Sequence, residues 1–139
     1  PATVPSTENE KSVFALRDFK EQTNEIKYDK QLEKGTTYIL EHNFFNFLIK
    51  DEPITKHITD ISFPETYHLN SVELLRFANK TNLMQHKNTN DLINHINKRR
   101  TKNGKWKNNF TYKADGYINF DKGNNSSEWT TYVIKNALK

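Results

Sequence analysis

The sequence predicts a single α+β domain in which a helix-turn-helix is followed by a basic β-hairpin, as in winged-helix proteins. Two amphipathic segments with capping residues, near 71–79 and 90–100, predict the pair of helices. Lysines alternate with aromatic and other residues over 105–113, as in a half-exposed strand, and Asp115-Gly116 is a typical hairpin turn before 117–120. We therefore expect the hairpin to span 105–120.

Length and composition fit one domain. The chain has 139 residues, and aromatic residues, at 12%, supply large apolar side chains for a core. Residues 1–10 are polar and predict a disordered tail before a domain over 11–139. The absence of cysteine excludes disulfides and thiolate metal sites. No apolar run approaches the roughly 20 residues of a membrane-spanning helix, so no membrane partner is expected.

The N-terminal half predicts one helix and one strand region. Ser12 precedes apolar residues at helical spacing, which predicts a helix that ends near Thr23. Gly35 is typical of a turn. Residues 36–49 are rich in β-branched and aromatic side chains, which favours a central core strand or a hairpin.

Capping residues mark the helices of the C-terminal half. Asn70 can accept hydrogen bonds from the first turn of the helix that follows it, and Glu73, three residues on, completes a capping box. Leu92 and Ile96 belong to the apolar stripe of the second helix. Ser127 predicts the start of a C-terminal helix.

Positive charge is concentrated in the C-terminal half. Residues 1–66 contain 8 Lys and Arg against 12 Asp and Glu, whereas 67–139 contain 13 against 5, so the two halves carry −4 and +8. Seven of these cations lie between 98 and 113 with no acidic residue among them. They are Lys98, Arg99, Arg100, Lys102, Lys105, Lys107 and Lys113.

A dense group of Lys and Arg is what binding to a phosphate backbone requires. The sequence therefore predicts a nucleic-acid-binding domain, with DNA favoured over RNA, duplex DNA as the expected form and transcription regulation as the expected role. Asn94 and Asn97 on the second helix are candidate readers of base edges. The run 98–102 also matches a nuclear-import signal, which predicts a nuclear protein in a eukaryote and a cytoplasmic one otherwise.

Two other functions stay open at this point. The basic half would also suit an acidic protein partner. A small nuclease or RNase toxin can be assembled from scattered His, Lys and carboxylate side chains. The five histidines, however, have no metal-binding spacing, and no residue stands out as a general base. We expect no catalytic residue, metal or cofactor, and we expect Trp106, Phe110 and Tyr112 to face the core.

The stretch 67–79, Tyr-His-Leu-Asn-Ser-Val-Glu-Leu-Leu-Arg-Phe-Ala-Asn, resembles the strand-to-helix signature of KilA-N/APSES DNA-binding domains. In that family a hydrophobic residue and Asn-Ala-Thr lead into a helix with a Leu-Leu or Ile-Leu pair and a following Ala. Here Ser and Val replace the usual Ala-Thr, and the Asp-Gly that often precedes the signature is absent. The resemblance covers 67–118 and implies sequence-preferring binding to duplex DNA, with 88–107 in contact.

Overall fold

The computed structural model describes residues 7–46, 52–111, 115–116 and 125–139, and this part of the chain is helical. Its elements are α1 (Thr7–Thr23), α2 (Asp29–Glu41), α3 (Ser71–Lys80), the 3-10 turn η1 (Lys87–Thr89), α4 (Asn90–Lys98) and α5 (Glu128–Ala137). The described residues form no β-strand and only two isolated bridges, between Asn46 and Pro53 and between Trp106 and Ser127. No helix among them is long and apolar enough to cross a bilayer.

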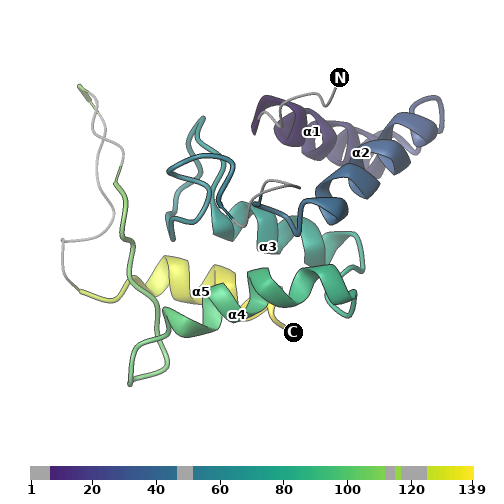
Figure 1. The fold of residues 1–139 in the computed structure, drawn as a ribbon. Helices are drawn as coiled ribbons and strands as arrows, with labels where there is room; N and C mark the ends of the chain where they lie inside the picture. The colour runs from purple at the N-terminus through teal and green to yellow at the C-terminus, as the bar shows by residue number, and fades with distance from the viewer. Residues whose placement is uncertain (1–6, 47–51, 112–114, 117–124) are drawn as a thin grey trace.

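Helix α3 is the centre of the structure. It lies between the antiparallel pair α1–α2 and the pair α4–α5 (Figure 1). Most of its residues are buried, including Leu74 and Leu75, which have no exposed surface. Asn70 caps it as expected, because its side-chain oxygen accepts from the backbone nitrogens of Val72 and Glu73.

The predicted strand at 36–49 is wrong, because α2 continues to Glu41. Leu32 and Ile39 pack into the core from one side of this helix, so burial against α1 overrides the strand propensity of its residues. Gly35, expected in a turn, is a contact point between the helices: a Cβ there would lie 2.3 Å from Cγ2 of Val13. Phe44, with a positive φ of 73°, follows the helix and is buried.

The predicted hairpin at 105–120 is also wrong, and with it the α+β winged-helix fold. The backbone of Trp106 bonds to the start of α5: its nitrogen donates to Thr131 Oγ1 (3.0 Å) and its oxygen accepts from Ser127 N (2.9 Å). Asn109 N donates instead to the oxygen of Ile61 (3.0 Å). Residues 105–111 therefore bond to other segments and form no ladder. Residues 112–114 and 117–120 lie outside the described residues.

The four helices expected at the N-terminus, near 71–79, near 90–100 and at the C-terminus are confirmed. Ser127 accepts from the nitrogen of Thr130 (3.0 Å) and caps α5, as its position predicts. α1 begins at Thr7, five residues before the expected start at Ser12. Glu10, expected in a disordered tail, is therefore part of this helix, and it is buried.

Candidate nucleic-acid interface

The predicted cations of 98–107 lie at the end of α4 and in the loop that follows it. We call residues 98–107 the basic turn. Two residues close this loop. The nitrogen and the hydroxyl of Thr101 both donate to the oxygen of Lys105 (2.8 and 2.9 Å), and Lys105 N donates back to Thr101 Oγ1 (3.1 Å). Gly104, with a φ of 71°, supplies the left-handed conformation that so tight a loop needs. The loop therefore brings its cations close together.

Arg100 is held against the base of the basic turn. Its guanidinium carbon lies 5.5 Å from the ring centroid of Trp106, a cation–π contact. A Cβ at Gly104 would lie only 3.1 Å from Nη2 of Arg100, so the guanidinium also packs on the turn backbone. Trp106 itself is 1% exposed, and its Nε1 donates to the oxygen of Ile96 (2.8 Å). This confirms the expected core position of Trp106.

Most of the predicted cations are free to meet a ligand. Lys98, Arg99, Arg100, Lys102 and Lys107 are exposed, and none of them forms an ion pair with the described residues. Lys105 is different, because it is half-buried and paired with Glu128 in the first turn of α5. Lys113 lies outside the described residues.

The two candidate base readers are placed beside the basic turn. Asn94 and Asn97 are both exposed on α4, three residues apart and so on one side of the helix. Leu92 and Ile96 are buried and fix α4 with this polar side outward. The expected asparagines are therefore exposed on the helix that leads directly into the cations of 98–102.

The charge of the basic turn acts on its neighbour His95. Burial is the main cause that lowers the pKa of this imidazole, and the charges of Arg99 and Lys98 lower it further. Its Nε2 donates to the oxygen of Thr59 (2.7 Å), which favours the charged form but does not outweigh burial. Asp60 opposes the two cations by raising the pKa, so burial accounts for most of the net shift.

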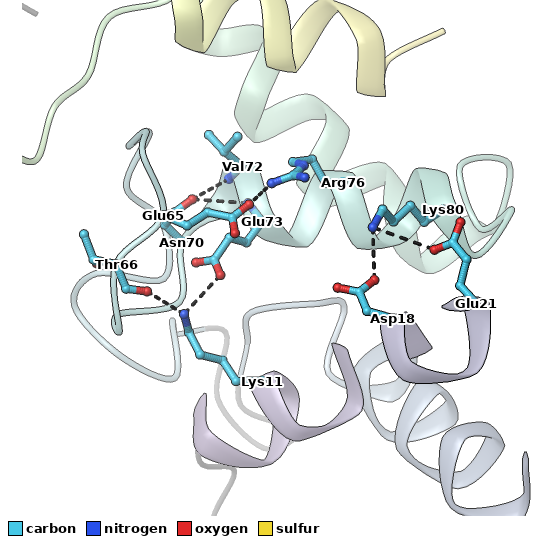
Figure 2. A network of polar contacts seen from close by, with 10 residues as sticks. All are labelled: Lys11, Asp18, Glu21, Glu65, Thr66, Asn70, Val72, Glu73, Arg76 and Lys80. Atoms are coloured by element: carbon cyan, nitrogen blue, oxygen red, sulfur yellow. Dashed lines mark hydrogen bonds and ion pairs between the residues drawn. The ribbon is translucent and has the colours of Figure 1, made fainter. Parts of the chain in front are cut away.

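Several carboxylates pair with Lys and Arg of α1 and α3 and not with the basic turn. Lys11 donates to Glu73 (3.0 Å) and to the oxygen of Thr66 (2.6 Å), and Lys80 pairs with Asp18 (3.0 Å) across the α1–α3 seam (Figure 2). Glu21 also lies 3.9 Å from Lys80, and Glu65 pairs with Arg76 (Figure 2). These carboxylates connect α3 to α1 and to the loop before α3, so they do not neutralise the basic turn.

The histidines form no metal site among the described residues, where no group of three or more His, Asp or Glu could hold an ion. His57 bonds to Asp60 (2.8 Å), and its ring lies on those of His68 (centroids 4.6 Å apart) and Phe110 (4.3 Å). Asp60 also accepts from Asn109 (2.6 Å). This cluster therefore joins the loop of 57–68 to the segment after the basic turn.

One feature of the surface was not anticipated from the sequence. Trp129 and Tyr132 of α5 are 57% and 64% exposed. Ser127 predicts the helix that carries Trp129, but nothing in the sequence pattern distinguishes Trp129 from the buried Trp106. Neighbouring helices, not local spacing, decide which of the two tryptophans is covered.

No known protein family, curated protein or solved structure matches this chain. The resemblance of 67–118 to KilA-N/APSES domains stays a prediction. The hairpin that it implies near Trp106 does not form in the described residues. Function must therefore be inferred from the surface that the chain itself presents.

Proposed function

We propose that the protein binds nucleic acid through the basic turn and the adjoining exposed side of α4. One observation carries the proposal: five cations within 98–107 are exposed and have no carboxylate partner among the described residues. Placing so many like charges together is unfavourable unless a polyanion or solvent counterions compensate them. A phosphate backbone provides that compensation, and the counterions it releases drive the binding.

DNA is favoured over RNA by the shape of α4. An α-helix fits the major groove of B-form DNA, where amide side chains can bond to adenine edges. The corresponding groove of A-form RNA is too deep and narrow for side chains to read. Asn94 and Asn97, exposed beside the cations, are suited to this role, with the basic turn on the flanking phosphates.

Salt dependence of binding to a blunt DNA duplex tests the proposal. If the five free cations each contact a phosphate, the log–log slope of affinity against salt should be about −4 to −5. Replacing Arg99 and Lys102 by Gln should weaken binding at least tenfold and make the slope less steep by about two. Arg100 is left intact because it packs on Trp106.

A charge-matched control separates the basic turn from net charge. Lys30 and Lys34 are exposed on α2, outside the basic turn, so K30Q/K34Q removes the same two charges elsewhere. We expect this variant to bind almost as well as the unaltered chain. An equal loss in both variants, or a flat salt response, would overturn the proposal. Tighter binding to an acidic polypeptide than to the duplex would assign the surface to a protein partner.

A further inference from the structure

Helix α5 presents two large aromatic side chains to solvent. Trp129 and Tyr132 are three residues apart and lie on one side of the helix, opposite the buried Ile134. Leaving this much apolar surface in water costs free energy, and contiguous apolar patches of this kind typically mark binding sites. The two rings are therefore a candidate binding surface.

These rings line a groove of about 400 Å³ between α5 and α3. Its α3 wall is made by Arg76, Asn79 and Lys80, and Asn136 adds a second amide from α5. No Asp or Glu lines the groove, since the carboxylates that pair with Arg76 and Lys80 come from α1 and from the loop before α3. The flat rings and the amides form a surface that can hold a base, whereas Arg76 and Lys80 are already paired with carboxylates outside the groove.

The groove continues toward the basic turn. Asn79 also lines a second groove, of about 520 Å³, which reaches Asn97 on α4. Asn82 and Gln85 add further amides, and Lys139 is its one charged lining residue. Asn97 directly precedes Lys98 of the basic turn. Two grooves that share Asn79 and have no acidic lining residue therefore lie between the aromatic pair and α4, and we call them together the track.

We propose that this track holds a single strand of DNA that leaves the duplex bound at the basic turn. Bases of the unpaired strand stack on Trp129 and Tyr132, and the strand passes the amides of Asn79 and Asn82 before it joins the duplex near Asn97. The inference rests on the proposed function and defines its substrate as DNA with a duplex and an unpaired end. A base inside a duplex cannot serve, because both of its faces are covered by neighbouring base pairs.

The tryptophan content gives a direct readout. The chain has two tryptophans, and Trp106 is 1% exposed, so a change in emission on binding reports on Trp129. The probes are a blunt duplex and the same duplex with a single-stranded thymidine extension of about eight nucleotides, a length within the site sizes of single-strand-binding modules. We expect the extended probe to bind about tenfold more tightly and to quench the emission. The blunt duplex should bind without quenching.

Variants of the aromatic pair complete the test. W129L/Y132L should bind the extended probe about tenfold or more weakly than the unaltered chain does, because it gains no affinity from the extension. Its affinity for the blunt duplex should be unchanged. The matched control is F19L/Y28L, which removes another exposed aromatic pair, 46% and 37% exposed, at the far end of the α1–α2 hairpin. It should behave like the unaltered chain with both probes.

The two proposals fail in distinguishable ways. Equal affinity for both probes, with salt-dependent binding retained, would overturn the single-strand track and leave the basic turn standing. A different outcome is that polyglutamate quenches the tryptophan emission as strongly as the extended probe does. That result would also overturn the single-strand track, because the groove would then be a site for an acidic protein. Failure to bind either probe would overturn both.

Discussion

The indole nitrogen of Trp106 donates to the backbone oxygen of Ile96 over 2.8 Å, and this bond fixes the basic turn to the last turn of α4. The backbone of the same tryptophan bonds to Ser127 and Thr131 at the start of α5. Arg100 rests on its ring. Trp106 thus sets the relative positions of α4, the basic turn and α5.

Replacing Trp106 by Phe should destabilise the protein by about 2–3 kcal/mol, because the smaller ring leaves a cavity and the oxygen of Ile96 keeps only one of its two donors, Arg99 N. Urea denaturation followed by far-UV circular dichroism measures the difference. Trp129→Phe is the matched control: its side chain is largely exposed, so we expect a change within about 0.5 kcal/mol. Equal effects of the two substitutions would contradict the assigned role of Trp106.

Gly35→Ala should destabilise the α1–α2 hairpin although alanine favours a helix. The gain in helix propensity is at most about 1 kcal/mol. The added methyl group would lie 2.3 Å from Cγ2 of Val13, a branched side chain that cannot bend away, and such overpacking costs about 1–3 kcal/mol. The unfolding free energy should therefore fall.

A double-mutant cycle identifies the cause. In V13A the clashing methyl groups are absent, so G35A added to V13A should be neutral or stabilising. The coupling free energy between the two positions should be about 1 kcal/mol or more. Additive effects would mean that the helices do not approach each other at Gly35.

Local rules predicted the helices of the C-terminal half, because the signals that set them are local. Asn70 and Ser127 cap the helices whose starts they predict, and the apolar spacing of Leu92 and Ile96 gives the buried side of α4. The prediction for the N-terminal half was wrong at Gly35, because the role of this glycine depends on Val13, 22 positions earlier in the chain. A glycine that allows two helices to pack closely cannot be distinguished, in a single sequence, from a glycine that forms a turn.

The basic turn was predictable in part for a similar reason. Exposure of Lys98, Arg99 and Lys102 follows from the cost of burying charge and needs no tertiary information. The pairing of Lys105 with Glu128 depends on where α5 begins in space, so the sequence could not single it out. The prediction of a hairpin was wrong because the backbone of Trp106 bonds to the start of α5 and that of Asn109 bonds to Ile61.

The charges of Arg99 and Lys98 should affect the titration of His95, although burial is the main cause of its shifted pKa. Burial first, and then Arg99 and Lys98, lower its pKa from 6.5. The imidazole should therefore titrate below pH 6.5 in an NMR experiment on its ring protons. Because the pKa of His95 is lower in the folded protein than in the unfolded chain, its titration lowers the free energy of unfolding as the pH falls through 6.5.

Arg99→Gln removes one of these charges, so the pKa of His95 should rise toward its ordinary value while remaining below it. Lys30→Gln, a cation on the exposed surface of α2, should leave that pKa unchanged. A His95 pKa at or above 6.5, or one that does not respond to Arg99, would contradict the local electrostatics.

Glu10 gives the largest expected pH effect on stability. It is 1% exposed, neither carboxyl oxygen has a partner among the described residues, and burial raises its pKa from 4.5 to about 8. Between these two values the folded protein holds a proton that the unfolded chain has released, so stability is greatest near pH 4.5 and falls as pH rises toward 8. Each pKa unit corresponds to about 1.4 kcal/mol, so the loss should reach several kcal/mol.

Glu10→Gln removes the ionisable group and keeps a similar shape. Its unfolding free energy should match that of the unaltered chain near pH 4.5 and exceed it by several kcal/mol at pH 8, as measured by urea denaturation at both values. Glu33→Gln, at an exposed position of α2, should follow the unaltered chain at both pH values. If E10Q and the unaltered chain keep the same difference from pH 4.5 to 8, Glu10 is ionised in the folded protein and α1 does not bury it. Because α1 also carries Lys11 and Asp18, which bond to Glu73 and Lys80 of α3, loss of its docking at alkaline pH would free both α3 residues as well.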